Sequence, residues 1–472
     1  MAQALTLHED RLFPAEPGQR AIARRLYAAT RGLPIVSPHG HTDPAWFATN
    51  ASFTDATDLL LRPDHYLYRM LYSQGIPLER LGIGLEPGTC GEVASREAWR
   101  LLASHWHLFR GTPSSLWLDH VFAEVFGMTV RLGAETADLY FDRIGECLRR
   151  DEFRPRALFE RFNIEVLTTT ESPLDPLTHH QSLRHGEWRG RILTAYRPDP
   201  VVDPGYPGFR ENLDELATLT GEDTATWDGY LAAHRRRRDH FRRMGATSTD
   251  HGHPTARTAD LSPREANALF HRVLAEGASA EDAELFRAQM LVEMARMSHD
   301  DGLVMQIHPG SHRNHNPTLF RALGRDRGAD IPTPTNYVHA LKPLLDRFGN
   351  DPRLSIIVFT LDESAYSREL APLAGHYPAL RLGPAWWFHD SPNGLLRFRE
   401  LTSETAGFYN TVGFNDDTRA FLSIPARHDV ARRIDATYLA RLVAEHRIDE
   451  DDAVATAIDL AYHLPRRAYR LD

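Results

Sequence analysis

The sequence His39-Gly40-His41 is the first pattern in the chain that could bind a metal ion. It ends a short apolar run, Pro34–His41, which has the length and bounds of a buried strand. Residues two apart on a strand point to the same side, so the two imidazoles would face one point. Neutral imidazole nitrogens are ligands that zinc-type ions prefer. Alone the pattern is weak, because two exposed histidines in a turn have the same spacing.

Two further ligand types end later apolar runs. His308 ends a run that starts at Leu303, and Asp417 lies near the end of a run that starts at Thr411. Of Asp416 and Asp417, strand alternation lets only one point inward. Three histidines and a carboxylate around one ion form a common catalytic set with an exchangeable position. We therefore expect His39, His41, His308 and Asp417 as metal ligands. A buried structural histidine remains the alternative for His308.

The basic residues limit the number of ions. The chain has 54 lysines and arginines, of which one is Lys342 and 53 are arginine. A carbamylated lysine that bridges two ions would have to follow a strand, whereas Lys342 lies in a helical pattern. The sequence therefore predicts one divalent ion, and the nitrogen-rich ligand set favours zinc.

Eight short apolar runs, separated mostly by helix-period segments, would position these residues. The runs span Pro34–His41, Glu165–Glu171, Ile192–Asp199, Gly245–Gly252, Leu303–Gly310, Ser355–Asp362, Leu382–Phe388 and Thr411–Arg419. Alternating strands and helices predict βαβ units, and eight of them predict an α/β (β/α)8 barrel of the TIM type. Each run ends in residues capable of chemistry, at the barrel end where active sites form. We expect one elaborated domain over residues 1–472, with a large helical insertion after strand 1 at about 50–160 and a smaller helical excursion at about 205–244.

Seven segments in the same order resemble the uronate (glucuronate) isomerase family of the amidohydrolase superfamily. They are Leu33–His41, Asp64–Arg69 (DHYLYR), Tyr196–Asp199 (YRPD), Asp250–Gly252 (DHG), Met305–Asn316, Ala385–Phe388 (AWWF) and Val412–Arg419. The family's TTDDP is here Thr169–Pro173 (TTESP), its TDSR is Asp416–Arg419 (DDTR), and its usual HCH is His39–His41 (HGH). These departures indicate a divergent branch.

The resemblance implies a metal-dependent aldose–ketose isomerase of hexuronates in carbohydrate catabolism. It would convert D-glucuronate to D-fructuronate and D-galacturonate to D-tagaturonate, through an enediol. The implied catalytic residues are Asp417, His65, Tyr66 and Arg419, and the implied substrate-binding residues are Arg197, Arg313 and Trp386, or its neighbour Trp387. Each has a structural alternative: a core aromatic for Tyr66 and the tryptophans, an ion-pair partner for Arg419, a loop surface charge for Arg197. Asp250 and His251 could line the site or only support it.

Two other functions compete with this hypothesis. A mononuclear metal hydrolase or deaminase could use the same ligands to activate water, but it has less use for arginines around its pocket. A metal-stabilised barrel without activity is disfavoured, because polar residues gathered at strand ends cost stability.

Bulk composition excludes several partners. A net charge of −10 argues against nucleic acid or an anionic membrane as a binding partner. The one strongly basic run, Arg235–Arg238, is expected on a solvated helix face. The sequence contains no run of about 18 apolar residues, so no transmembrane helix is expected. Two cysteines and an N-terminus without a secretory pattern favour the cytoplasm. The partner expected is a small sugar acid, and the oligomeric state stays open.

Overall fold

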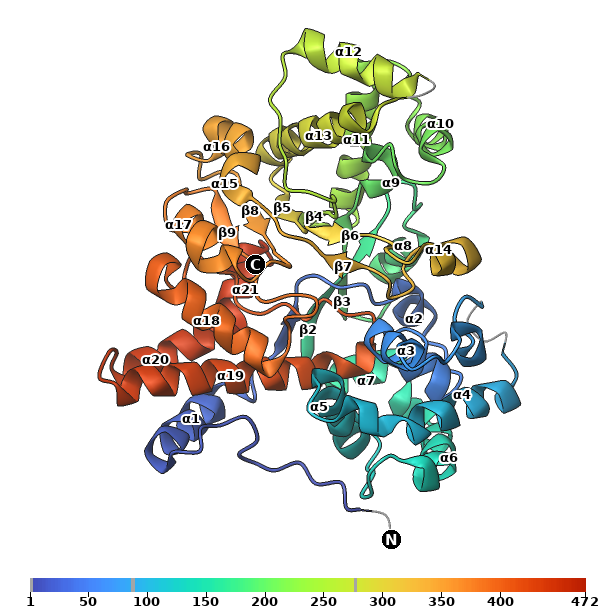
Figure 1. The fold of residues 1–472 in the computed structure, drawn as a ribbon, viewed down its shortest axis with the longest axis vertical. Helices are drawn as coiled ribbons and strands as arrows, with labels where there is room; N and C mark the ends of the chain where they lie inside the picture. The colour runs from blue at the N-terminus through green and yellow to red at the C-terminus, as the bar shows by residue number, and fades with distance from the viewer. Residues whose placement is uncertain (1–2, 86–89, 276–277) are drawn as a thin grey trace.

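A parallel β-sheet of seven short strands lies at the centre of the fold (Figure 1). The computed structural model describes residues 3–85, 90–275 and 278–472. The strands pair in the order β1-β2-β3-β4-β5-β8-β9, every pair being parallel. Their bounds are β1 Ile35–Ser37, β2 Ile164–Glu171, β3 Arg191–Tyr196, β4 Ser248–His251, β5 Val304–Ile307, β8 Ile356–Val358 and β9 Leu380–Leu382. Each of these strands overlaps one of the first seven predicted runs.

The eighth predicted run does not form a strand in the structure. Thr411 makes a single parallel bridge to Leu382 at the end of β9. Beyond it the chain follows an irregular path, and the Thr418 carbonyl accepts a hydrogen bond from the His41 amide at 3.1 Å. The α/β fold and the curled parallel sheet are therefore confirmed, whereas the eight-stranded barrel is confirmed only in part. A two-stranded antiparallel hairpin, β6 Ser311–His312 with β7 Ile331–Pro332, was not predicted.

Helices follow the strands and cover the outside of the sheet. From the second half of the chain they are α12 Pro263–Leu274, α13 Ala280–Asp301, α14 Pro317–Leu323, α15 Tyr337–Ala340, α16 Lys342–Phe348, α17 Ala371–Ala374, α18 Pro392–Ala406, α19 Ile424–Ala444, α20 Glu450–Ile458 and α21 Leu464–Ala468. Local signals explain their ends. Ser262 and Glu265 form a capping box at the start of α12, and Gly302, at φ 82°, ends α13.

The segment between β1 and β2 is helical. It contains α2 Pro44–Thr49, α3 His65–Tyr72, α4 Glu92–Ser104, α5 Pro113–His120, α6 Ala137–Leu148 and α7 Pro155–Arg161. Its apolar residues, including Trp99, Phe122 and Tyr140, form one buried cluster that also contains Ile35 and Ile164 of the sheet. The segment therefore packs against the strands as part of the same core, and Figure 1 shows it together, in blue to teal, on one side of the molecule.

The remaining helices are α1 Pro17–Thr30, α8 Thr178–His185, α9 Asp199–Val202, α10 Phe209–Thr220 and α11 Trp227–Arg243. On α11 the prediction of a solvated basic face is wrong for half of the run. Arg237 and Arg238 are buried, and Arg238 makes a two-point ion pair with Asp301. Among the described residues no helix has the length and apolar character needed to span a bilayer.

Candidate active site

One cavity of about 820 Å³ lies beyond the carboxyl ends of the strands, and every residue predicted for the site lines it. Those residues are His39, His41, His65, Tyr66, Arg197, His308, Arg313, Trp386, Asp417 and Arg419. They lie on α3 and on the segments that follow β1, β3, β5, β6, β9 and Thr411. The topology brings them together because parallel strands end at one edge of the sheet.

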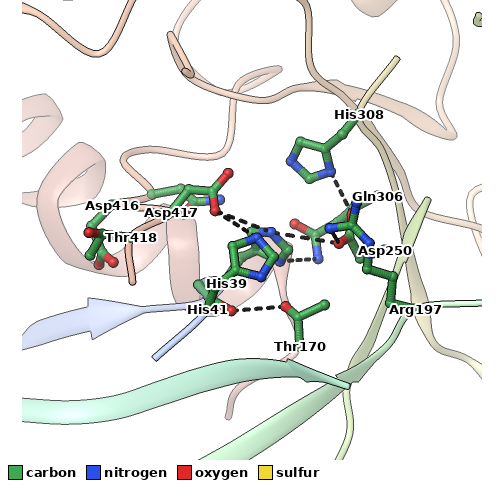
Figure 2. A network of polar contacts seen from close by, with 12 residues as sticks. His39, His41, Thr170, Arg197, Asp250, Gln306, His308, Asp416, Asp417 and Thr418 are labelled. Carbon is green, nitrogen blue, oxygen red and sulfur yellow. Dashed lines mark hydrogen bonds and ion pairs between the residues drawn. The ribbon is translucent and has the colours of Figure 1, made fainter. Parts of the chain in front are cut away.

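His39, His41 and Asp417 form the first group that could hold a metal ion. Oδ1 of Asp417 lies 3.2 Å from Nε2 of His41 and 3.6 Å from Nε2 of His39. Figure 2 shows the Asp417 carboxylate pointing at both histidine rings. The neighbouring Asp416 points elsewhere, with its carboxylate 2.9 Å from Nε2 of His428. Only Asp417 of the two faces the histidines, but strand alternation is not the reason, because Asp417 has a positive φ of 35° and lies outside any strand.

A second group shares His39 with the first and contains Asp250 and His308. Oδ1 of Asp250 lies 2.7 Å from Nδ1 of His308, and its other oxygen lies 3.9 Å from Nε2 of His39. The rings of His39 and His308 stack with centroids 4.9 Å apart, and Nε2 of His308 is buried without a partner. The four predicted ligands therefore lie in one cluster, but His308 is grouped with Asp250 and not with His41.

Burial sets the protonation of this cluster. Desolvation lowers the pKa of His39 to about 4, so its ring is neutral near pH 7, as a metal ligand must be. Burial alone would raise the pKa of Asp417, but the neighbouring His39 and His41 outweigh it and lower that pKa. The cluster thus combines the neutral imidazole of His39 with the ionised carboxylate of Asp417, two donor types that zinc accepts.

Asp250 holds the arginine that the sequence assigned to substrate. The Arg197 guanidinium donates to Asp250 at 2.8 Å (Figure 2). It also donates to Asp199 at 2.9 Å. These two carboxylates outweigh the effect of burial and raise the pKa of Arg197. Asp250 is fully buried, whereas the side chain of Arg197 remains 25% exposed. Arg197 therefore enters the cavity with two of its nitrogens already bound and its orientation fixed.

The other predicted arginines are less constrained. Arg313 donates to Asp330 at 2.9 Å. Arg419 has its nearest carboxylate, Asp326, at 3.9 Å, and 39% of its side chain is exposed. Arg419 is consequently the most available of the three predicted cations for an anionic or hydroxyl-bearing ligand.

Aromatic rings form one wall of the cavity. The ring of His65 stacks on Trp387, with centroids 5.3 Å apart, and Trp386 packs edge-on against His308 at 4.7 Å. Burial and the charge of Arg419 lower the pKa of His65 to about 3, so this ring is neutral. His65 can therefore accept or donate a hydrogen bond, but it is not a cation near neutral pH.

Comparisons with known proteins agree with this geometry. A family model described as glucuronate isomerase matches residues 17–469. The chain belongs to the glucuronate isomerase family. A protein named uronate isomerase from Phenylobacterium zucineum is 70% identical over all of this chain and 98% of its own length. The crystal structure of glucuronate isomerase from Caulobacter crescentus matches with a TM-score of 0.97 and 63% identity, covering 100% of this chain and 98% of that one. A uronate isomerase structure from Thermotoga maritima has a TM-score of 0.91 at 27% identity, covering 98% and 99%.

The site in this isomerase-family chain also contains residues to which the sequence prediction assigned no definite role. Of the open pair Asp250 and His251, Asp250 reaches the cluster, whereas His251 is buried beside Thr249. Asp390, which was not singled out, also lines the cavity, as does Arg427, which lies in a segment that resembles the family but was given no role. Strand alternation from Ser248 could have placed Asp250 inward. No comparable signal marks Asp390, which lies in the loop between β9 and α18, and Arg427 lies in α19.

Proposed function

We propose that this cavity interconverts the aldose and ketose forms of hexuronates, D-glucuronate with D-fructuronate and D-galacturonate with D-tagaturonate. The observation that carries the proposal is the convergence of a His-His-Asp metal group, several arginines and an aromatic wall in one cavity. Isomerisation moves one proton between two adjacent carbons, so it needs positioned bases and polarising groups instead of an activated water. The chemistry fits a family whose members are named uronate isomerase.

We assign one divalent ion, zinc, to His39, His41 and Asp417. The three donor atoms lie within 4.8 Å of one another, and His39 is buried and neutral. When bound, the ion acts as a Lewis acid that polarises a substrate oxygen. Lys342 is unsuited to bridge a second ion, because it is exposed on α16 and pairs with Asp346. His308, whose Nδ1 contacts Asp250, supports the site from the opposite side of His39.

The remaining residues act on the sugar itself. Asp417 is the proposed proton carrier, because its second oxygen is free to face the substrate while Oδ1 faces the histidines. Arg419 binds the oxygens that gain charge in the enediolate, since guanidinium binds such oxygens in pairs. Arg197 and Arg313 bind the anionic end of the substrate, and Trp386 packs on its carbon skeleton. His65 and Tyr66 donate or accept hydrogen bonds at the carbonyl end.

The alternative, a mononuclear hydrolase or deaminase, has the same metal group. Five arginines line the cavity, Arg197, Arg313, Arg325, Arg419 and Arg427. Aspartates line the cavity as well and pair with three of these arginines, so the argument rests on the guanidinium donors and not on net charge. A sugar acid can use several such donors, whereas a neutral nucleobase has less use for them. The acidic overall charge also favours a small-molecule substrate over nucleic acid. We propose a cytoplasmic role in carbohydrate catabolism.

The deciding experiment measures keto-uronate formation by the purified protein from D-glucuronate and D-galacturonate, with release of ammonia from nucleobases and amides followed in parallel. Formation of a keto-uronate supports the proposal. Ammonia or a hydrolytic product without a keto-uronate supports the alternative.

A further inference from the structure

The hydroxyl of Tyr66 is held in a fixed state by two groups. It donates a hydrogen bond to Oδ1 of Asp390 at 2.8 Å and accepts one from the Phe388 amide at 2.8 Å. Phe388 has a positive φ of 67°, a conformation that a bulky residue adopts only when its surroundings enforce it. The contact therefore joins α3, in the helical segment after β1, to the loop after β9.

Asp390 is itself fixed by an arginine. Its Oδ2 accepts a hydrogen bond from Arg427 at 2.7 Å, and both side chains are buried, at 10% and 3% exposure. Arg427 also donates to Ser423 at 3.1 Å, and its guanidinium lies 3.6 Å from the centre of the Trp117 ring. Asp390 thus has one oxygen on a cation and the other on the Tyr66 hydroxyl.

The bonding capacity of a phenol shows what Tyr66 can still do. Its hydroxyl has one proton and two lone pairs. The proton is directed to Asp390 and one lone pair to Phe388, which leaves one lone pair for a ligand in the cavity. Tyr66 can therefore accept a substrate proton only if it gives up its own. Burial raises its pKa well above 10, so a free phenolate is unfavourable and the two transfers have to occur together.

We propose that Asp390, held by Arg427, is a positioning residue and proton acceptor that acts through Tyr66. As a substrate O–H breaks, its proton forms a new O–H bond with the Tyr66 oxygen, and the proton that Tyr66 carried passes to Oδ1 of Asp390. The negative charge moves from Asp390 to the substrate oxygen, and both transfers reverse when the product hydroxyl forms. No oxidant or further reactant is needed. The inference rests on the proposed isomerase function.

The test compares Asp390→Asn, Tyr66→Phe and the double variant in the uronate assay. Asparagine has a single acceptor oxygen, so it can accept from Tyr66 only by giving up its hydrogen bond from Arg427, and in either orientation it cannot take the Tyr66 proton. We expect kcat to fall about 100-fold for Asp390→Asn, while KM changes less than about threefold. In the Tyr66→Phe background the same substitution should cause no further loss of kcat.

Asp435→Asn is the matched control. Asp435 forms an equally buried pair with Arg399, at 2.7 and 3.1 Å, away from the cavity. It should lower the melting temperature as Asp390→Asn does and leave kcat within about twofold.

Any of three results would overturn the inference. The first is a loss of kcat in the double variant that equals the product of the two single losses, and the second is an unchanged kcat for Asp390→Asn. The third is a loss of kcat in Asp435→Asn as large as that in Asp390→Asn. If Asp390→Asn does not fold, the relay is tested on the wild type, by measuring its single-turnover rate in mixtures of H2O and D2O. A curved dependence on the D2O fraction, from two moving protons, is expected, and a linear one contradicts the relay. Wild type without activity on either uronate would instead refute the proposed function.

Discussion

Replacement of Asp250 by asparagine is the most informative single change outside the proposed ligands His39, His41 and Asp417. The variant keeps the size of the side chain and removes its charge. It leaves Arg197 with Asp199 as its only carboxylate, and it puts an amide where His308 and Arg197 now find two carboxylate oxygens. An amide has one acceptor oxygen, so one of the two partners must lose its hydrogen bond.

The expected loss has two parts. Removing one member of a buried charge pair costs about 3–5 kcal/mol. With about 2.1 cal/mol/K of unfolding entropy per residue, the 472 residues give about 1 kcal/mol/K, so the melting temperature should fall by about 3–5 °C. Loss of the Arg197 orientation should reduce kcat/KM by about 100-fold, because misplacing a binding group by about 1 Å has an effect of this size.

Differential scanning calorimetry and the uronate assay measure the two parts separately. Asp301→Asn is the control, because Asp301 makes a two-point pair with the buried Arg238 outside the cavity. It should lower the melting temperature and leave kcat/KM nearly unchanged. If Asp250→Asn retained wild-type kcat/KM, or lost no more of it than the control, Arg197 would not depend on Asp250.

Three further changes test other parts of the site. His39→Ala should abolish binding of the single ion, measured by elemental analysis, whereas His308→Ala should retain it, because His308 groups with Asp250 and not with His41 and Asp417. Gly252→Ala should preserve the fold but reduce kcat/KM by about 100-fold, because the new methyl would lie 2.3 Å from an Arg197 nitrogen, which can move away. Glu171→Gln should change the pH dependence of stability. Burial raises the pKa of Glu171 to about 8 from 4.5, so the folded state binds this proton more tightly than the unfolded state does. The free energy of unfolding of the wild type should therefore fall by up to about 1.4 kcal/mol per pH unit as pH rises between these two values.

Each of these predictions can fail clearly. Equal loss of metal in both histidine variants would make His308 a ligand of the same ion. Gly32→Ala controls for the added methyl, because nothing lies within 4 Å of its new Cβ, and it should be as active as wild type. A Gly252→Ala enzyme of equal activity would contradict the role of Arg197. Urea unfolding from pH 5 to 8 tests Glu171, and identical slopes for variant and wild type would contradict the raised pKa.

The sequence predicted the positions of the strands better than their closure into an eight-stranded barrel. Seven apolar runs became strands because residues such as Val36, Val304 and Ile357 are buried in the sheet. The eighth run, Thr411–Arg419, is largely buried and carries the expected carboxylate, but it forms only one bridge. Gly413 and Asp417 have positive φ values of 79° and 35°, which take the chain out of the strand conformation. The run's backbone bonds to β9 and to His41 could not be inferred from apolar pattern alone.

Side chains at strand ends were predictable from the apolar pattern, whereas His65 and Tyr66 on α3 were predicted only through the family resemblance. His39 and His308 follow from strand ends, and they lie together because the strands do. Asp390 and Arg427 are separated by 36 residues and meet only through the folding of α19 beneath the loop after β9. Such pairs depend on tertiary packing, which neither spacing nor residue type encodes locally.

The central claim is tested most directly by following D-glucuronate and D-galacturonate with the purified protein and with Asp417→Asn at equal concentration, before and after removal of metal by a chelator. The account predicts keto-uronate formation by wild type, its loss with the metal, its return when zinc is added, and at least a 100-fold lower rate in the variant. Metal-free protein or Asp417→Asn that isomerises uronates at the wild-type rate would contradict it.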